Sequence, residues 1–507
     1  MSADTPLSRR TILHGGLNAS LGFGLAFGAF GLPGMAHATP AGALGKARRF
    51  SWEELQDRAR HLAARPYRAG AKSTHLASDY DESVRLTYGQ AEFLGDNIRL
   101  FPATAAVAEQ PVGLHLLQNG MARPLMDSRG LFADGGTADP AGFRVMDAGQ
   151  PRDWLAFLGA SYFRSAGADN QYGLSARGIA VDTGLARAEE FPRFSDFWIE
   201  ELGPDQTIVY ALLDGPSLSG AYRFDNRKGP QGVTQDVSAV LFMRKDIERL
   251  GVAPASSMFW YDQSAEKRID WRPEIHDSDG LAIFAANGER VFRPLINPPN
   301  ARISVFNAPS PAGFGLIQRD RNFAHYQDDG AFYEKRPDLW VEPQGEWGAG
   351  AVMLYEMPTA SETADNIAAF WTPDAAPRAG ERRDYAYRLH WVSADPSAWE
   401  GARLVHRWQG AAGIPGALPT EHARKYVFDF AGPNLAGLTR QSGLVADTNL
   451  PEDRLLHSAA FPVAGQDSLC RVTLDIALDG KPPSEFRLYL RQGDDALSET
   501  VIQPLLP

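Results

Sequence analysis

The sequence contains a single cysteine, Cys470, among 507 residues. An intramolecular disulfide is therefore excluded, and no pair of cysteines is available to hold a metal. The sequence also lacks the Gly-Lys-Ser/Thr loop that cradles phosphates and the His-Glu-x-x-His motif of zinc peptidases. The segment Gly215-Pro216-Ser217-Leu218-Ser219-Gly220 misses the spacing of a Gly-x-Ser-x-Gly nucleophile elbow by one position, so it is interpreted as a turn.

Histidines are present but scattered, without the spacing of a ligand set. We therefore predict neither a metal site nor a cofactor. The residues concerned are His75, His115, His276, His325, His390, His406, His422 and His457.

An excess of positive charge is also missing: 62 acidic residues outnumber 50 Lys and Arg, which gives a net charge of −12. An acidic chain has no electrostatic reason to bind nucleic acid or anionic lipid, so neither partner is expected. Beyond the N-terminal region, no hydrophobic run is long enough to span a bilayer.

The N-terminal region has the pattern of an export signal. Ser8-Arg9-Arg10-Thr11-Ile12-Leu13 is a twin-arginine motif, an apolar run follows over residues 15–32, and Ala36-His37-Ala38 is a cleavage site. We predict a signal peptide over residues 1–38 and a soluble periplasmic chain from Thr39 to Pro507. A retained membrane anchor is the alternative.

The patterning of the mature chain favours an all-β fold. Plentiful Gly (49) and Pro (35) indicate many turns. Alternating or apolar runs predict strands that include residues 84–88, 97–101, 207–213, 220–224, 351–355, 367–371 and 383–391, and a hairpin over 281–292. A capping box at Ser51 predicts one short helix. Residues 321–350 are expected to form a long functional loop.

A domain boundary is predicted near Asp395-Pro396-Ser397, with domains over residues 39–395 and 402–507. Residues 425–430 alternate, and residues 471–478 are expected to turn through 479–483 and return as 486–490. Strands at this spacing over about a hundred residues are typical of an immunoglobulin-like sandwich.

The stretch from Trp271 to Leu281 concentrates an Arg, a Glu, a His and two Asp. Asp277 and Asp279, two apart on an extended chain, are expected to point to the same side. One interpretation is a surface turn whose Asp side chains bond their own backbone. The other is a catalytic carboxylate held by Arg272 and His276.

Carboxylates and aromatic side chains together have the chemistry of a glycan cleft, since a glycosidase needs two carboxyl groups. The candidate acids are Asp277, Asp279, Glu362 and Asp365, and the aromatic set is Phe323, Tyr326, Tyr333 and Trp340. Core packing remains an equal alternative for Tyr333 and Trp340.

Several long strings resemble the periplasmic glucan biosynthesis proteins OpgG and OpgD, also called MdoG and MdoD. They are Phe157-Leu158-Gly159-Ala160-Ser161-Tyr162-Phe163-Arg164, Gly173-Leu174-Ser175-Ala176-Arg177-Gly178, residues 272–281, and Asp365-Asn366-Ile367-Ala368-Ala369-Phe370-Trp371. The twin-arginine signal resembles that of the D-type members.

The resemblance implies a large N-terminal β-sandwich of the galactose mutarotase-like kind, followed by the immunoglobulin-like domain. It also implies a role in making osmoregulated periplasmic glucans with a β-1,2-linked glucose backbone. Members of the family act as inverting β-1,2-glucanases, and similar proteins transglycosylate instead.

Carried onto this chain, the resemblance makes Asp365 the general acid and Asp277 the general base, with Asp279 the alternative base. A protonated Asp365 would need its pKa raised, by burial or by Glu362 nearby. The supporting residues are Glu362 and Tyr333 (acid and relay), Arg336 and Trp340 (subsites), and His276 and Arg272.

Two alternative functions and two further questions stay open. The chain could be a non-catalytic glucan-binding scaffold that works with the membrane glucan glucosyltransferase. It could act on another polysaccharide. Whether it hydrolyses or transglycosylates, and whether it forms a homodimer, is not decided by the sequence.

Overall fold

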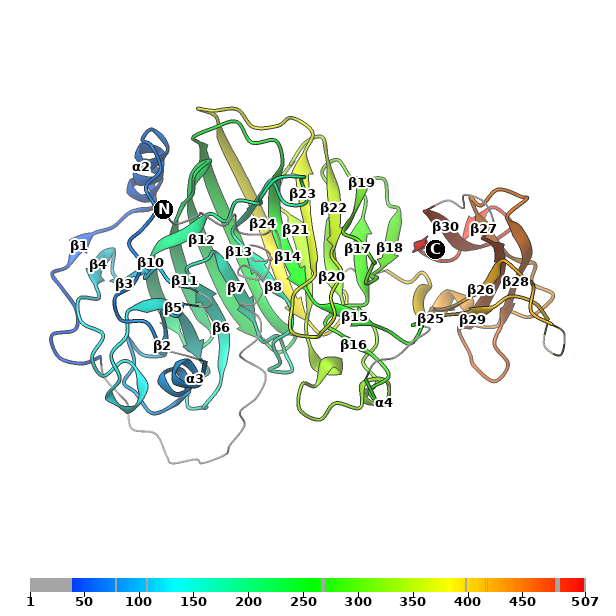
Figure 1. The fold of residues 1–507 in the computed structure, drawn as a ribbon, viewed down its shortest axis with the longest axis horizontal. Helices are drawn as coiled ribbons and strands as arrows, with labels where there is room; N and C mark the ends of the chain where they lie inside the picture. Colours follow the sequence, from blue (N-terminus) through cyan, green and yellow to red (C-terminus); the bar gives the residue numbers. More distant parts are fainter. Residues whose placement is uncertain are drawn as a thin grey trace, which may run out of the picture.

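The computed structural model describes residues 39–77, 80–105, 108–265, 270–396, 399–414, 416, 418–478 and 484–505. The predicted export signal, with Arg9 and Arg10, lies outside these residues, as do Ser397 at the predicted boundary and the predicted turn at 479–483. Two large β-sheets stand in the larger body, and a smaller β body lies beside it at the C-terminal end (Figure 1). The prediction of an all-β fold is confirmed.

The smaller of the two large sheets has ten strands. Its strands, in spatial order, are β19 (Arg302–Asn307), β22 (Gly350–Glu356), β23 (Ile367–Pro373), β14 (Leu250–Ser257), β8 (Ser175–Arg177), β7 (Tyr162–Ser165), β6 (Asp153–Leu158), β5 (Pro140–Met146) and β2 (Ile98–Pro102), with β9 (Ile179–Val181) paired to β14. Strands β7, β8, β14 and β23 of this sheet contribute to the candidate site.

The larger sheet has sixteen strands and runs through both bodies. In spatial order they are β1 (Arg48–Arg49), β4 (Met121–Pro124), β3 (Gly113–Gln118), β10 (Arg193–Gly203), β11 (Gln206–Asp214), β12 (Leu218–Gly229), β13 (Gly232–Met243), β24 (Arg382–Val392), β21 (Asp338–Pro343), β20 (Gly313–Ile317), β17 (Gly280–Phe284), β18 (Arg290–Pro294), β32 (Thr500–Pro504), β30 (Glu485–Gln492) and β27 (Leu444–Thr448), with β31 (Asp495–Ala496) paired to β30. Parallel pairing of β18 with β32 continues the sheet from one body into the other.

The main hydrophobic core draws on both large sheets. Strand β24 shows the pattern clearly, because Tyr385, Tyr387, Leu389 and Trp391 are buried at alternate positions, as predicted. Each square ångström of apolar surface removed from water stabilises the fold by about 25 cal/mol, so this face fixes the register of the strand.

The C-terminal body adds a four-stranded sheet of β25 (Arg403–Ala411), β26 (Ala423–Ala431), β29 (Leu469–Ala477) and β28 (Leu455–Pro462). A second core joins this sheet to the end of the larger one. The predicted hairpin between residues 471–478 and 486–490 is wrong: β29 pairs with β26 and β28, whereas β30 pairs with β27 and β32. Alternation identified both strands but could not assign them to a sheet.

Among the described residues, the helices are α2 (Trp52–Ala63), α3 (Tyr80–Tyr88) and α4 (Phe323–Tyr326), with short 3-10 turns η2 (Ala133–Gly135), η3 (Tyr333–Lys335) and η4 (Pro433–Leu435). The predicted cap is confirmed, since the Ser51 hydroxyl accepts a hydrogen bond from the Glu54 amide. The predicted strand over residues 84–88 is wrong. Adjacent Leu86 and Thr87 are both buried, which suits a helix face better than a strand with one buried face.

Residues 321–350 are more ordered than the predicted long loop. They contain α4, η3 and strand β21, which pairs with β20 and β24. The Gly, Pro and charged residues on either side of β21 hid its short apolar pattern.

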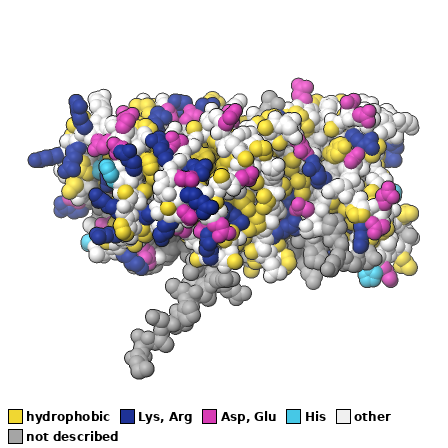
Figure 2. All heavy atoms as spheres, turned by 90° about the horizontal axis from the view of Figure 1, so that it is seen from above, with side chains coloured by type: hydrophobic (Ala, Val, Ile, Leu, Met, Phe, Trp, Pro, Cys, Tyr) yellow, Lys and Arg dark blue, Asp and Glu magenta, His cyan; other side chains and the backbone are white. Residues whose placement is uncertain are grey.

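Among the described residues, no helix combines the length and apolar character needed to cross a membrane. On the face seen in Figure 2, Lys and Arg side chains are interspersed with Asp and Glu, and a hydrophobic area lies between them.

Candidate active site

The segments that carry Asp277 and Asp365 meet at one bend of the chain, between Ser257 of β14 and Phe259 of β15 (Phe259–Tyr261). The Asp277 amide donates to the Met258 carbonyl at 2.8 Å. From the other segment, the Asn366 side chain accepts from the Phe259 amide at 2.8 Å and donates to the Phe259 carbonyl at 3.0 Å. Two predicted catalytic segments are thus anchored to consecutive residues.

Strand pairing explains this meeting. Ser257 lies opposite Ile367 of β23, which directly follows the Asp365–Asn366 turn. Phe259 lies opposite His276 of β16 (Ile275–His276), which directly precedes Asp277. A buried hydrogen bond of 2.8 Å between the Ser257 and Ser278 hydroxyls closes the arrangement.

Asp277 is buried, with 3% of its surface exposed, and its Oδ1 accepts a hydrogen bond from the Arg336 guanidinium. Burial raises the pKa of Asp277, and the positive charges of Arg336, His276 and Arg164 oppose that rise. Arg336 also lies over the ring of Tyr333, 4.0 Å from its centroid. The carboxylate is therefore desolvated but paired.

Gly173 makes room for Arg336. A Cβ atom at this position would lie 2.8 to 3.1 Å from the Cδ, Cβ and Cγ atoms of Arg336. Any larger residue would displace the arginine that holds Asp277, so the glycine has a positioning role.

Asp365 is also buried, at 4% exposure, in the turn before β23. Tyr162 of β7 and Arg177 of β8 lie near Asp365. The negative charge of Asp365 contributes to the raised pKa of both side chains. Burial, more than the charges around it, raises the pKa of Tyr162 to about 12. Arg177 is held at 2.7 Å by Glu189.

Glu362, Tyr333 and Arg272 form a second connected group. The Tyr333 hydroxyl donates to Glu362 Oε2 at 2.5 Å, and Arg272 binds both Glu362 oxygens at 2.9 and 3.1 Å. The same guanidinium donates to Asp328 at 2.6 Å and to Asp270. Glu362 is thus tied to this group, so the predicted use of Glu362 to raise the pKa of Asp365 gains no support from its contacts.

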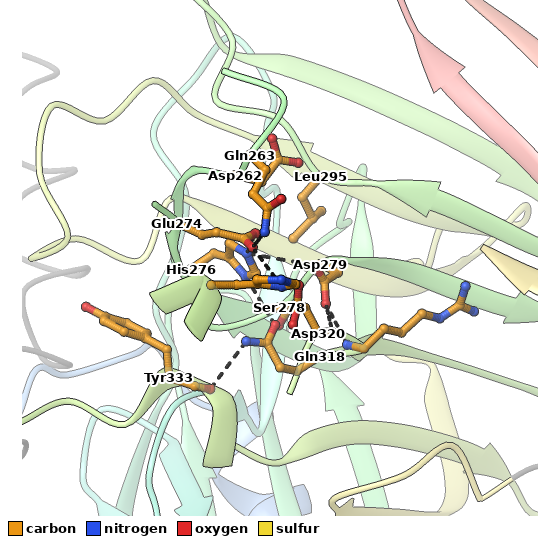
Figure 3. Close-up of polar contacts among 12 residues, drawn as sticks. Asp262, Gln263, Glu274, His276, Ser278, Asp279, Leu295, Gln318, Asp320 and Tyr333 are labelled. Atoms are coloured by element: carbon orange, nitrogen blue, oxygen red, sulfur yellow. Dashed lines mark hydrogen bonds and ion pairs between the residues drawn. The ribbon is translucent and has the colours of Figure 1, made fainter. Parts of the chain in front are cut away.

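The prediction that Arg272 and His276 hold the catalytic carboxylate is wrong, because the structure gives both side chains other partners. Arg272 holds three other carboxylates, and Arg336 holds Asp277. The ring of His276 lies between Glu274 Oε2, 3.0 Å from Nε2, and Gln318 Oε1, 3.1 Å from Nδ1 (Figure 3). Its influence on Asp277 is electrostatic.

His276 is fully buried, which by itself lowers its pKa, but the charges of Asp279 and Glu274 raise it to about 9. Burial in turn raises the pKa of Glu274, and the contact with His276 opposes this. A protonated His276 between two carboxylates is the state that these shifts favour when no other cation is bound.

Asp277 and Asp279 do not serve one cleft, contrary to the expectation from their spacing. Asp279 Oδ2 accepts from the backbone amides of Arg319 at 2.5 Å and Asp320 at 2.8 Å (Figure 3). Asp279 lines a recess between the two bodies that does not include Asp277. The chain leaves β16 irregularly, so the two-residue alternation of an extended strand does not apply.

That recess is open to solvent. Residues from both bodies line it, among them Glu274, Asp279, Asp320, His406 and Arg407. Two groups of side chains beside it, Glu274–His276–Asp279 and Asp320–His325–His406, bring ligand-type atoms within 4.8 Å of one another.

Trp340 is in strand β21 and is 5% exposed, within the core shared with the C-terminal body. It packs over Gly313, where a Cβ would lie 2.3 Å from the indole ring. Its placement favours the core-packing alternative rather than a sugar subsite.

Sequence reasoning assigned no role to Tyr162, Arg164, Gly173 and Arg177, although all four lie in the strings that carry the family resemblance. The signal that could have found Arg164 and Arg177 is an arginine inside a short apolar strand. Such a charge is rarely buried without a carboxylate partner.

Comparison with known proteins identifies the family of this chain. The family model described as "Periplasmic glucan biosynthesis protein, MdoG" matches residues 50–505. Glucans biosynthesis protein D 1 of Ralstonia nicotianae is 44% identical over 485 residues, which covers 88% of this chain and 90% of the relative. The probable glucans biosynthesis protein D of Shewanella oneidensis is 44% identical over 408 residues, 77% of this chain and 75% of the relative.

Among solved structures, a galactose mutarotase related enzyme of Lactobacillus acidophilus matches with 9% identity and a TM-score of 0.22, over 55% of this chain and 97% of that one. At that score the match carries no weight for fold or function. The family model and the relatives cover most of the chain, and the span of the family model includes Asp277 and Asp365. The chain therefore belongs to the periplasmic glucan biosynthesis protein family, MdoG.

Proposed function

We propose that this protein is an enzyme of periplasmic glucan synthesis that acts on the β-1,2-glucan backbone by an inverting acid/base mechanism. One observation carries the proposal: two buried carboxylates, Asp277 and Asp365, come from segments anchored on either side of the Ser257–Phe259 bend. Inverting glycosidases need two such groups, one to protonate the leaving oxygen and one to activate the nucleophile.

Asp277 is the general base. Burial raises its pKa, which makes the carboxylate a stronger proton acceptor, and Arg336 keeps it ionised. Removal of a proton from water, or from a glucan hydroxyl, then takes place at Asp277.

Asp365 is the general acid, which protonates the glycosidic oxygen of the leaving glucan. The connected group of Tyr333, Glu362 and Arg272 holds η3 against the turn at residues 361–366 and so supports the acid segment. Burial raises the pKa of the Tyr333 hydroxyl, so the tyrosine keeps its proton and orients Glu362 through this hydrogen bond.

Hydrolysis and transglycosylation differ only in the nucleophile that reaches the site. Residues 321–350, which include α4 and η3 and supply Tyr333 and Arg336, decide between them by admitting or excluding water. Export by the twin-arginine pathway, with a mature chain that starts at Thr39, is part of the same proposal.

The test is to incubate the mature chain with linear β-1,2-glucan and follow the products by chromatography and mass. Shorter linear products, absent with Asp365→Asn and with Asp277→Asn, support a glucanase. Products lighter by one water indicate cyclising transglycosylation. The matched control is Asp453→Asn, because the Asp453 side chain is 79% exposed.

Retained glucan binding without any turnover of the wild type would overturn the enzyme proposal. It would leave the alternative, a glucan-binding scaffold that works with the membrane glucan glucosyltransferase. The anomeric configuration of the first product, followed by NMR, tests inversion separately from activity.

A further inference from the structure

Glu274, His276 and Asp279 each turn one donor atom toward a common point beside the recess (Figure 3). The His276 Nε2 atom lies 3.0 Å from Glu274 Oε2 and 3.8 Å from Asp279 Oδ1. All three donor atoms lie within 4.8 Å of one another. Two carboxylates at this range repel each other unless a proton or a cation lies between them.

The other oxygen of each carboxylate is already held by a neutral donor. The Gln263 side chain donates to Glu274 Oε1 at 2.6 Å. The backbone amides of Arg319 and Asp320 donate to Asp279 Oδ2 at 2.5 and 2.8 Å. Both carboxylates are thus oriented before any ion arrives, with one oxygen each left for it.

The orientation of His276 is fixed in the same way. The Gln318 side-chain amide donates to the Tyr326 hydroxyl at 2.7 Å and to the Tyr333 carbonyl at 3.3 Å. Its oxygen therefore faces His276 Nδ1, which must carry a hydrogen to bond at 3.1 Å. Metal-bound histidines show this arrangement, with one nitrogen held by an outer partner and the other free to bind the ion.

The donor distances suit a small ion. Two donors on a tetrahedral zinc ion, each about 2 Å from it, lie roughly 3.3 Å apart. The observed separations of 3.0 and 3.8 Å from His276 Nε2 lie on either side of this value. One imidazole nitrogen with two carboxylate oxygens is a set that zinc and neighbouring transition ions accept.

The recess gives such an ion an entry path. Glu274 and Asp279 are among its lining residues, so an ion can reach both carboxylates from the recess. The arginines at its edge do not compete, because Arg319 binds Glu499 at 2.5 Å and Arg407 binds Asp262 at 2.5 Å.

The neighbouring group of Asp320, His325 and His406 is less suited to hold an ion. His325 Nδ1 lies 2.5 Å from Asp320 Oδ2, and Nε2 lies 3.2 Å from the Asn322 amide nitrogen. The Asn322 oxygen accepts from the Ala324 amide, so the nitrogen faces His325. His325 Nε2 therefore accepts this hydrogen bond, so the ring hydrogen lies on Nδ1, the nitrogen that faces Asp320, and Nδ1 has no lone pair for an ion.

We propose that Glu274 Oε2, His276 Nε2 and Asp279 Oδ1 form a binding site for a divalent transition cation of the zinc class, with its open coordination positions toward the recess. The ion neutralises both carboxylates and ties the segment before β17 to the recess wall. A protonated His276 would satisfy the same carboxylates with a single charge, and the experiment separates these two states.

The test is equilibrium dialysis of the chelator-treated mature chain against Zn²⁺, with bound metal measured by mass spectrometry. We expect one zinc ion per chain, and at least about tenfold weaker binding for Glu274→Gln and for Asp279→Asn. The control is Glu342→Gln, which changes a carboxylate 2.8 Å from His390 Nε2 elsewhere in the protein and should leave zinc binding unchanged.

A second measurement does not depend on the variants. Co²⁺ bound through His276 and two carboxylates should give the chain a visible spectrum unlike that of the aqueous ion. An aqueous-type spectrum, no zinc retained by the wild type, or equal retention by the wild type and both folded variants would overturn the site and leave a histidine–carboxylate ion triad. Each readout is binding, so it is independent of glucan turnover.

Discussion

The Tyr333 hydroxyl donates to Glu362 Oε2 across 2.5 Å and so joins η3 to the turn that leads to Asp365. Tyr333 itself is almost completely buried, and its ring carries the guanidinium of Arg336 on one face. One tyrosine thus contacts both the arginine that holds the proposed base and the glutamate beside the proposed acid segment.

Tyr333→Phe should reduce both stability and turnover. Hydrogen bonds to charged groups contribute roughly 1.5–3 kcal/mol, and partial exposure of Glu362 brings the expected loss in unfolding free energy to about 1 kcal/mol. Urea unfolding measures it. The control is Tyr387→Phe, because the buried Tyr387 hydroxyl has no hydrogen-bond partner in the described part of the chain. Equal effects of the two changes would contradict the role of the hydroxyl.

Arg336→Gln should lower kcat/KM on β-1,2-glucan at neutral pH by at least about tenfold, since breaking a buried ion pair leaves an uncompensated charge. Without the guanidinium the pKa of Asp277 rises further, so the acidic limb of the pH profile should move to higher pH. Arg378→Gln, in an exposed pair with Asp246, is the control. A change in KM alone, with an unmoved profile, would assign Arg336 to substrate binding only.

Gly173→Ala should lower activity by about ten- to a hundredfold, because misplacement of a positioning group by a fraction of an ångström to an ångström costs rate on this scale. The added methyl group would displace Arg336. Gly410→Ala serves as the matched control, since a Cβ there meets no atom within 4 Å. Measurement of kcat together with the thermal midpoint separates a local effect from loss of folding. A fully active Gly173→Ala variant would refute the positioning role of Gly173.

Asp338 should make stability depend on pH. It is completely buried next to Arg321 and the Gln318 amide, and burial raises its pKa from 3.8 to about 7. At pH values between 3.8 and about 7, the folded state binds more protons than the unfolded state. The contribution of the protonated side chain is therefore complete at low pH and is lost as pH rises through about 7.

Asp338→Asn removes this titration. Relative to the wild type, the variant should gain stability when unfolding is measured from about pH 4 to about pH 8. Parallel stability curves for the two proteins would show that Asp338 does not titrate in this range.

The sequence predicted the strands with clear alternation, such as β24, and the two segments, around Asp277 and Asp365, that are anchored at the Ser257–Phe259 bend. It failed where local pattern was ambiguous. Residues 84–88 alternate like a strand but form part of a helix, and the strand β21 was hidden between Pro and charged residues. The hydrophobic period of a segment can be read from its local sequence, whereas the strand with which it pairs cannot be read in this way.

The chain by itself determined its family, its all-β class and the residue types available for chemistry, because these depend on strings and periodicity. Only the tertiary structure decided that Arg336 pairs with Asp277, 59 residues away, and that Arg272 does not. It also placed Asp279 with Glu274 and His276 around one point rather than beside Asp277. Such pairings follow from the order of strands in the sheets and from the paths between them, which no local spacing encodes.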